Sequence, residues 1–376
     1  MRIEIVSETW PPEVNGVALT VHGLCQGLRV LGHQVGVVRP RQADEAAPDA
    51  DTLLAHSAPL PRYPGLRFGL PAGRQILGRW RARRPQAVYI ATEGPLGWSA
   101  LRAARRLGIP VATGFHTRFD EYMARYGAGA LSPLAFAWLR RFHNQGQATL
   151  TPTRELADFL TRRGFRQVAQ LGRAVDTRLF DPARRSATLR AQWGLDNDEL
   201  GVIHVGRLAA EKNLDLLFRA FDAIRRQRPG ARLIIVGDGP GRAALAAAHP
   251  HAVFTGIQRD VELARHFVSG DLFLFPSLSE TFGNVTLEAM ASGLASVAFD
   301  YGAAREHLRD GEHGHAPARK DEAAFIAAAL RLASDDAARR RMGAAARQAV
   351  SGLHPLDVSR RFADLLSSLS IKEHAA

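Results

Sequence analysis

The chain has 376 residues, 46% of them hydrophobic and 23% charged, which is too long for one ordinary domain and too apolar for a disordered protein. No apolar run approaches the ~18 residues of a membrane-spanning helix, and the start MRIEIVSETW indicates a first strand and not a signal peptide. The single Cys25 excludes an internal disulfide and a cysteine zinc cluster, so we expect a cytoplasmic protein of two domains.

Basic residues are concentrated in the first half of the chain. Through residue 175 there are 23 arginines and 12 acidic residues, whereas the remainder has 26 basic and 25 acidic residues. A general bias toward arginine explains why only three positions are lysine. It does not explain why the excess of positive charge is confined to the first half. A basic excess confined to one half predicts an anionic partner for that half.

Strand-like and helix-like stretches alternate along the chain, which predicts an α/β fold of parallel sheets covered by helices. The stretch 42–73, rich in Pro, Ala and Gly, is expected to be irregular. We expect the main strands at residues 2–7, 34–38, 87–91, 111–113, 148–151, 200–205, 231–236, 253–255, 272–275 and 296–299.

Two domains are expected, 1–176 and 177–356, because the charge balance changes near Asp176. A last helix at about 357–370 has apolar residues at helical spacing and is expected to pack back on the first domain. Open parallel sheets bind ligands at the carboxyl ends of their strands, which predicts a shared cleft.

The most informative stretch is 271–300, where a buried strand is followed by a short helix. The helix begins near Gly283, and the free N–H groups at such an end attract anions. Glu280 precedes the helix and Glu288 lies inside it. Carboxylates beside a phosphate cradle suit sugar hydroxyls, so the stretch predicts a site for a nucleotide-linked sugar.

Arg207 and Lys212 bracket the turn that follows strand 200–205. Alone they would be solvated loop cations, but beside the anion-attracting helix start we interpret them as diphosphate ligands. The glycine-rich loop 237–241 allows close approach to a ligand, and an ordinary tight turn is an equally good interpretation.

In the first half, Gly16 and His116 lie where strands hand over to helices. Gly16 would let the backbone approach a phosphate or sugar, and the neutral imidazole of His116 could bond a sugar hydroxyl or a departing phosphate. Asp120 is better explained as a helix-start residue than as an acceptor base.

Two further patterns have alternative explanations. Asp196 and Asp198 form a DxD in a polar linker, which we interpret as a turn and not as a metal site. The segment 62–84 carries seven arginines among Leu, Ile, Phe and Trp residues, and it could rest on anionic lipid or contribute its apolar side to a domain core. No recognisable nucleic-acid-binding module accompanies it, so we expect no nucleic-acid partner.

The ordered motifs NGV, FHTRFDEY, GRAVD, VGRLAAEKN, VGDGP and SETFGNVTLE resemble those of retaining family-4 glycosyltransferases over nearly the whole chain. Within that family the chain is most similar to bacterial GDP-mannose-dependent α-mannosyltransferases and related glycolipid-forming enzymes. The resemblance implies the GT-B fold, two Rossmann-like domains facing a central cleft. It also implies hexose transfer from a nucleotide sugar to a lipid or glycan acceptor, with no metal ion or other cofactor.

The resemblance also implies roles for individual residues. Arg207 and Lys212 would neutralise the diphosphate, Glu280 would hold the donor sugar, and Glu288 would hold the ribose. Gly16 would leave room for the donor, with His116 contacting the sugar near its reacting carbon. The backbone that binds sugar and phosphates would belong to Phe282, Gly283, Asn284 and Val285.

Several alternatives stay open from the residues alone. No residue decides between guanine and uracil by physical argument, so a UDP-sugar such as UDP-glucose is the alternative donor. A membrane lipid on the cytoplasmic face fits the basic first half, and a glycan acceptor fits equally. A sugar-nucleotide epimerase and a non-catalytic protein that binds anionic surfaces are the alternatives from other functional classes.

Overall fold

The structure is a computed structural model that describes residues 1–13, 15–42, 45, 49–59, 67–116, 132–196 and 198–374. The chain divides into two compact units. Unit 1 comprises Met1–Arg173 and Pro355–Ala376, and unit 2 comprises Ala174–His354. The division therefore follows Arg173, just before the expected boundary at Asp176, and the C-terminal helix is assigned to unit 1.

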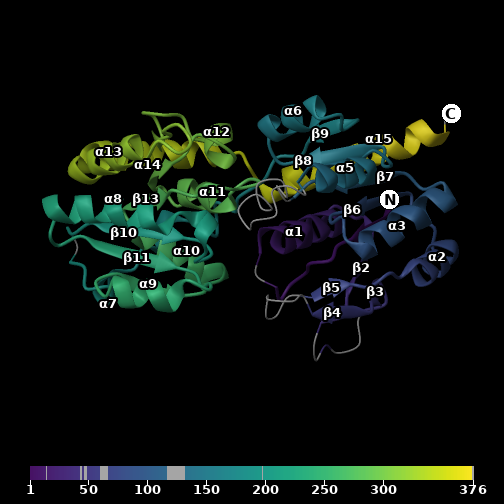
Figure 1. The fold of residues 1–376 in the computed structure, drawn as a ribbon, viewed down its shortest axis with the longest axis horizontal. Helices are drawn as coiled ribbons and strands as arrows, with labels where there is room; N and C mark the ends of the chain where they lie inside the picture. Colours follow the sequence, from purple (N-terminus) through teal and green to yellow (C-terminus); the bar gives the residue numbers. More distant parts are fainter. Residues whose placement is uncertain are drawn as a thin grey trace. The chain divides into compact units, whose positions relative to one another are not determined.

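Unit 1 is built on a seven-stranded parallel sheet in the order β3-β2-β1-β6-β7-β8-β9 (Figure 1). Its strands are β1 (Arg2–Val6), β2 (Gln34–Pro40), β3 (Thr52–Ala55), β6 (Ala87–Ile90), β7 (Val111–Gly114), β8 (Ala148–Thr151) and β9 (Val168–Gln170). Its helices are α1 (Gly16–Val30), α2 (Gly73–Ala82), α3 (Pro95–Leu107), α5 (Ser132–His143), α6 (Arg154–Arg162) and α15 (Pro355–His374).

Helices cover both faces of this sheet because alternate strand residues are apolar on either side. Helices α1 and α15 pack on one face, where Phe362 of α15 is fully buried against the ring of Tyr89. Helices α2, α3 and α5 pack on the other face. The prediction that 42–73 is irregular is wrong in part, because β3 and the antiparallel pair β4 (Ser57–Pro59) and β5 (Arg67–Gly69) lie within it.

The apolar side of α2 belongs to the core of unit 1. Ile76 and Trp80 are fully buried there, so the core interpretation of these two residues is the correct one. Because both side chains are buried inside the protein, neither Ile76 nor Trp80 can contact lipid. Within the described residues, no helix has the length and hydropathy needed to span a bilayer.

Unit 2 is built on a six-stranded parallel sheet in the order β12-β11-β10-β13-β14-β15, which confirms the predicted α/β class. Its strands are β10 (Gly201–Val205), β11 (Arg232–Val236), β12 (Val253–Gly256), β13 (Leu272–Phe275), β14 (Ala295–Ala298) and β15 (Gly314–His315). Its helices are η2 (Pro182–Arg184), α7 (Ala187–Gln192), η3 (Ala210–Lys212), α8 (Leu214–Gln227), α9 (Arg242–Ala248), α10 (Asp260–Ser269), α11 (Asn284–Ala291), α12 (Ala303–His307), α13 (Glu322–Ser334) and α14 (Asp336–Val350).

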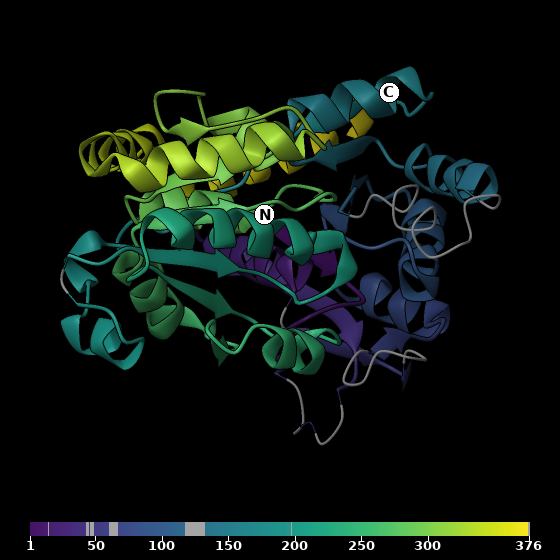
Figure 2. The same ribbon diagram turned by 60° about the vertical axis from the view of Figure 1, so that its left-hand side comes forward.

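The second sheet is also covered on both faces. Helices α8 and α13 bury one face, and α10 and α11 bury the other (Figures 1 and 2). Residues of β10 alternate between the two apolar cores. Val202 packs in the core under α8 and α13, and Ile203 packs in the core under α10 and α11. Strands β10 and β13 are neighbours, so the loops that follow them emerge side by side at the carboxyl edge of the sheet.

Candidate functional site

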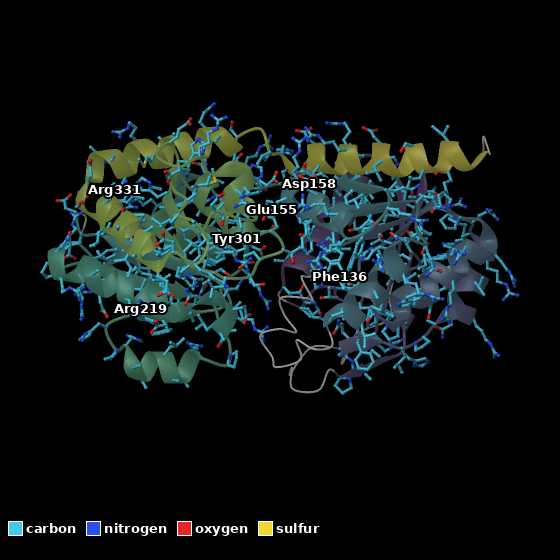
Figure 3. All side chains as sticks on the ribbon, turned by 45° about the horizontal axis from the view of Figure 1, so that its top comes forward. Phe136, Glu155, Asp158, Arg219, Tyr301 and Arg331 are labelled. Carbon is cyan, nitrogen blue, oxygen red and sulfur yellow. The ribbon has the colours of Figure 1, made fainter. Side chains whose placement is uncertain are left out.

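Two loops meet at the carboxyl edge of the unit 2 sheet, one after β10 and one after β13. The backbone N–H of Leu278 donates to the carbonyl of Glu211 at 2.9 Å, and the hydroxyl of Ser277 donates to the same carbonyl at 3.4 Å. Tyr301, on the loop after β14 (Figure 3), donates its hydroxyl to the carbonyl of Ser277 at 2.8 Å. These bonds fix the positions of the loops that carry the predicted site residues.

Lys212 and Glu280 form an ion pair across these two loops. The ammonium of Lys212 contacts Oε1 of Glu280, and Ser277 donates its hydroxyl to the same oxygen at 2.6 Å. The two charged side chains are only 14% and 15% exposed, and Nζ of Lys212 lies 5.5 Å from the ring centre of Phe275. Within the described part of the chain, Oε2 of Glu280 has no partner, so one carboxylate oxygen can still accept a hydrogen bond.

The start of α11 has the geometry expected of an anion-binding helix end. Gly283 precedes the helix with φ +93°, and no side chain caps the first N–H groups. A Cβ on Gly283 would lie 3.4 Å from Cγ of Glu280, which keeps the helix start close to the ion pair. The carbonyl of Phe282 accepts a 2.7 Å bond from Ala303, which ties this turn to the start of α12. Asn284 and Val285 are the first two residues of α11 and are half-buried.

Glu288 lies one turn into α11 and is half-buried. Burial raises the pKa of its carboxyl to about 7. Its carboxylate has neither an ion pair nor a hydrogen-bond partner among the residues that the structure describes. A buried carboxyl without a protein partner is a candidate for ligand binding.

The glycine-rich loop after β11 packs directly on the turn after β10. Gly237, with φ +135°, lies against the carbonyl of Gly206, and a Cβ on Gly239 would lie 2.5 Å from the carbonyl of Leu208. Asp238 accepts a 2.9 Å bond from the backbone of Leu208. The glycines are therefore required by loop packing, which supports the tight-turn interpretation. Arg207 is exposed on the turn that this packing holds.

His204 is a candidate that the sequence reasoning missed. It lies in β10, fully buried beneath Gly206, and its Nδ1 bonds the carbonyl of Leu274 at 3.0 Å. Burial lowers its pKa to about 4, so the ring is neutral and Nδ1 donates. Its Nε2 is buried without a partner among the described residues. The sequence did contain a signal for His204, because a polar ring stands inside the otherwise apolar strand residues VIHV.

In unit 1, Gly16 is the first residue of α1, as predicted, and the helix start is capped internally. The side-chain oxygen of Asn15 accepts bonds from the backbone of Val17 at 3.1 Å and of Ala18 at 2.8 Å. Asn15 in turn donates to the hydroxyl of Thr9 at 2.6 Å. Asn15 therefore already satisfies two N–H groups that a ligand phosphate could otherwise have used.

His116 follows β7 and is 9% exposed, with both ring nitrogens bonded inside unit 1. The guanidinium of Arg173 can only donate, so its 2.8 Å bond makes Nδ1 the acceptor. Nε2–H then donates to the hydroxyl of Tyr89, also at 2.8 Å. Burial, and then the charge of Arg173, lowers the pKa of His116 well below its ordinary value. The ring is neutral, and it must exchange one of these partners to bond a sugar.

Two further carboxyl groups lie at the same edge of the unit 1 sheet. Glu8 follows β1 and accepts bonds from the backbone of Leu96 at 2.9 Å and of Gly97 at 3.4 Å, and burial raises its pKa to about 7. Glu93 follows β6 and bonds the buried His143 at 3.1 Å. An acidic residue two or three positions after a buried strand was the signal in the sequence for both groups.

Asp196 precedes β10, at the edge of the sheet opposite the ion pair. Its backbone N–H donates to the carboxylate of Glu199 at 2.9 Å, and its carbonyl accepts from the backbone of Glu199. The two residues therefore form a local turn, and residue 197 lies outside the described residues. Asp120 also lies outside them. Within the described residues, no cluster of three His, Cys, Asp or Glu side chains is arranged to hold a metal.

Two family models match the chain. The model described as glycosyltransferase family 4 matches residues 14–179, and the model described as glycosyl transferases group 1 matches residues 199–335. The first match lies within unit 1 except for its last six residues, and the second lies entirely within unit 2. Together they cover the strands of both sheets except β1.

Known relatives span nearly the full chain. A GDP-mannose-dependent alpha-mannosyltransferase of Mycolicibacterium smegmatis is 36% identical over an alignment of 365 positions, which covers 93% of this chain and 92% of that protein. An alpha-monoglucosyldiacylglycerol synthase of Acholeplasma laidlawii is 27% identical and covers 84% of each chain. Among solved structures, Anabaena HepE in complex with UDP and glucose matches with a TM-score of 0.77 at 18% identity, over 98% of this chain and 100% of that one. This likeness shows the GT-B fold.

Proposed function

The chain belongs to the family-4 glycosyltransferases and is a hexosyltransferase for a lipid or glycan acceptor, and we propose that it moves mannose from GDP-mannose to a lipid. We propose further that the anomeric configuration is retained, that no metal ion takes part, and that transfer occurs at the cytoplasmic face of a membrane. The donor is supported by the 36% identity to the mycobacterial mannosyltransferase over most of both chains.

The observation that carries the proposal is the placement of Lys212 and Glu280 beside the uncapped start of α11. A nucleotide sugar joins two charged phosphates to a ring rich in hydroxyl groups. The ammonium and the helix start suit the phosphates, and the free oxygen of Glu280 suits the hydroxyls. Glu288, half-buried and without a partner in the described part of the chain, suits a ribose.

Transfer would break the bond between the anomeric carbon and the diphosphate oxygen and form a bond to the acceptor oxygen. Lys212 and Arg207 would stabilise the negative charge that develops on the departing diphosphate. The acceptor hydroxyl would attack from the face that the diphosphate leaves, and its proton would pass to a departing phosphate oxygen. His116 would contact the sugar in its neutral form, exchanging the Tyr89 or the Arg173 bond for a sugar hydroxyl.

Metal independence is supported by where the charged groups lie. The two cationic residues, Lys212 and Arg207, follow the carboxyl end of β10, whereas Asp196 and Asp198 precede that strand and lie at the other edge of the sheet. The DxD is therefore not positioned to bridge a metal to the diphosphate, and the cationic residues would supply the compensating charge.

A membrane acceptor is supported by the basic first half and by the exposed arginines of α2. Because Ile76 and Trp80 are buried in the core, the contact would be electrostatic, through exposed arginines, and not through insertion of these side chains. The alternative is a glucosyl donor, for which we take UDP-glucose, because the chain is also related to an alpha-monoglucosyldiacylglycerol synthase of Acholeplasma laidlawii.

The test is transfer from labelled nucleotide sugars to a membrane lipid extract. We expect label from GDP-mannose to enter the lipid phase, and transfer from UDP-glucose instead would establish the alternative donor. Conversion of the donor without any acceptor product would indicate an epimerase. Turnover of no donor would refute the transferase proposal.

A further inference from the structure

Arg173, in the stretch GRAVD, is the last residue of unit 1, and its guanidinium donates to Nδ1 of His116 at 2.8 Å. We propose that Arg173 is a positioning residue that fixes which ring nitrogen of His116 carries the proton, so that His116 donates a hydrogen bond to the transferred sugar. The contact with the sugar rests on the proposed function. The bond between the two residues, and its effect on the ring, do not depend on that function.

Strand β8 holds the backbone that precedes both partners, because it lies between β7 and β9 in the sheet. The N–H of Phe115, directly before His116, donates to the carbonyl of Leu150 at 2.9 Å. The N–H of Leu171, two residues before the arginine, donates to the carbonyl of Thr151 at 2.8 Å. Phe115 and Leu171 are both buried. The bond between the arginine and the histidine therefore joins two fixed pieces of backbone at the carboxyl edge of the unit 1 sheet.

Arg173 differs from an arginine that holds the fold together. Arg190, for comparison, donates to Asp271 at 2.9 Å and to several backbone carbonyls. Among the residues that the structure describes, Arg173 has no carboxylate partner, and the ring of His116 is the one acceptor of its guanidinium. Burial lowers the pKa of Arg173 to about 10, so the group is still charged at neutral pH. This partly desolvated charge is directed at His116.

The two partners of the His116 ring differ in what they require of it. The guanidinium of Arg173 can only donate, so its bond requires an unprotonated Nδ1. The hydroxyl of Tyr89 can donate or accept, so its bond to Nε2 is compatible with either tautomer. Burial, and then the charge of Arg173, lowers the pKa of His116 well below its ordinary value, so the ring carries a single proton. Arg173 therefore determines that this proton is on Nε2.

A sugar hydroxyl replaces Tyr89 at the ring more readily than it replaces Arg173. A hydrogen bond from a charged donor is roughly twice as strong as one between neutral groups. Displacing Arg173 would also take from a desolvated charge the acceptor that it has in the structure, whereas displacing Tyr89 breaks a neutral bond. Nε2–H of His116 then donates to a hydroxyl oxygen of the sugar, and the ring remains neutral.

The experiment measures the tautomer of His116 in the full chain, by long-range proton–nitrogen correlation NMR with isotope-labelled histidine. His116→Gln identifies the signals of this ring among those of the other histidines. Arg173→Met removes the guanidinium and keeps an unbranched side chain, and Arg173→Lys keeps a charged donor. Tyr89→Phe is the matched control, because it removes the other partner of the ring. The transfer rate from GDP-mannose, the melting temperature and the stabilisation by GDP are measured on the same proteins.

We expect a proton on Nε2 in the unaltered protein, in Tyr89→Phe and in Arg173→Lys, and a mixture of both tautomers in Arg173→Met. We expect Arg173→Met to lower the transfer rate by roughly tenfold, as for the loss of one hydrogen bond, with unchanged stabilisation by GDP. Arg173→Lys should restore part of this rate. A merely structural role of Arg173 would lower the melting temperature and leave the tautomer unchanged.

The same tautomer in Arg173→Met as in the unaltered protein would overturn the proposal, and so would a changed tautomer with an undiminished transfer rate. Absence of donor turnover by the unaltered protein would refute the proposed function, and with it the contact to the sugar. A tautomer that still responds to Arg173→Met in that case would show that the failure lies in the function and not in the bond between Arg173 and His116.

Discussion

The ammonium of Lys212 and the carboxylate of Glu280 are paired directly, although 68 residues separate them in the chain. The pair spans the loops after two neighbouring strands and lies next to the start of α11. Each partner holds the other in a partly buried position from which a ligand can bond both. Under the proposed function, the pair would link recognition of the diphosphate to recognition of the sugar.

Replacing Lys212 with Ala is expected to weaken binding of both nucleoside diphosphate and nucleotide sugar, by roughly 100-fold, because a partly buried cation is lost from the proposed diphosphate site. Replacing Glu280 with Gln removes the carboxylate but keeps an oxygen for the Ser277 bond. We expect this variant to bind the nucleoside diphosphate as before and to lose the preference for the nucleotide sugar. Calorimetric titration with both ligands measures the difference.

The matched control is Arg219→Ala, which removes one positive charge from α8 of the same unit (Figure 3). Arg219 is paired with Asp215 at 2.8 Å and with Glu322 at 2.5 Å, all on exposed surface. We expect its removal to leave nucleotide affinity unchanged. Equal weakening in the Lys212 and Arg219 variants would show that only net charge matters.

Glu288 is expected to make donor affinity depend on pH. Burial raises the pKa of its carboxyl from 4.5 to about 7, so the group is protonated in the free protein below that pH. If the carboxylate accepts bonds from ribose hydroxyls, affinity for an intact nucleotide sugar rises as pH increases toward 7 and then levels off. Glu288→Gln should abolish this dependence, and a pH-independent affinity in the unaltered protein would contradict the assignment.

The carboxyl of Glu288 also makes the stability of the fold depend on pH, in the direction opposite to its expected effect on donor affinity. Between pH 4.5 and about 7 the folded state keeps a proton that the unfolded state has lost, so the free energy of unfolding falls as pH rises through this window. Glu8 acts in the same direction, since its pKa is also raised to about 7. The difference between the unaltered protein and Glu288→Gln in denaturant unfolding isolates the contribution of Glu288.

Gly302→Ala is expected to destabilise unit 2 by about 1–3 kcal/mol. Gly302 has φ +58°, and a Cβ there would lie 2.6 Å from the carbonyl of Phe282, at the turn that leads into α11. Gly352→Ala is the control, because a Cβ at that position meets no atom within 4 Å. Thermal unfolding of both variants checks the prediction, and equal melting temperatures would contradict it.

Gly114→Ala is expected to disturb His116 without touching unit 2. A Cβ on Gly114 would press on the hydroxyl of Tyr89 and would lie 2.5 Å from Nε2 of His116. We expect a transfer rate lowered by about tenfold or more with unchanged stabilisation by nucleotide, as for loss of a positioned catalytic group. Tyr89→Phe removes the bond without adding bulk, and unchanged rates in both variants would show that His116 has no role in transfer.

Sequence patterns were sufficient for the architecture because apolar runs, glycine stops and helix caps are local signals. The strand 272–275 and the start of α11 at Asn284 lie where they were predicted. Short strands such as β4 and β5 carry too few residues for a periodic signal. Their pairing depends on contacts across the chain, which no local pattern contains.

The sequence could predict that Lys212 and Glu280 follow buried strands, but not that the two side chains are paired. Lys212 and Glu280 were each assigned a ligand, and nothing local indicated that they bond one another. The roles of the glycines in 237–241 were likewise undecided, because the carbonyl of Gly206 that excludes a side chain lies in the turn after another strand, β10. Buried polar groups such as His204 require knowledge of the surrounding core.

The most direct test of the account is the transfer of labelled hexose from GDP-mannose to extracted membrane lipid, with the anomeric configuration of the product assigned by NMR. We predict an α-mannosylated lipid whose formation is lost in Lys212→Ala and in Glu280→Gln. No turnover of GDP-mannose or UDP-glucose by the unaltered protein, or undiminished transfer by both variants, would contradict it.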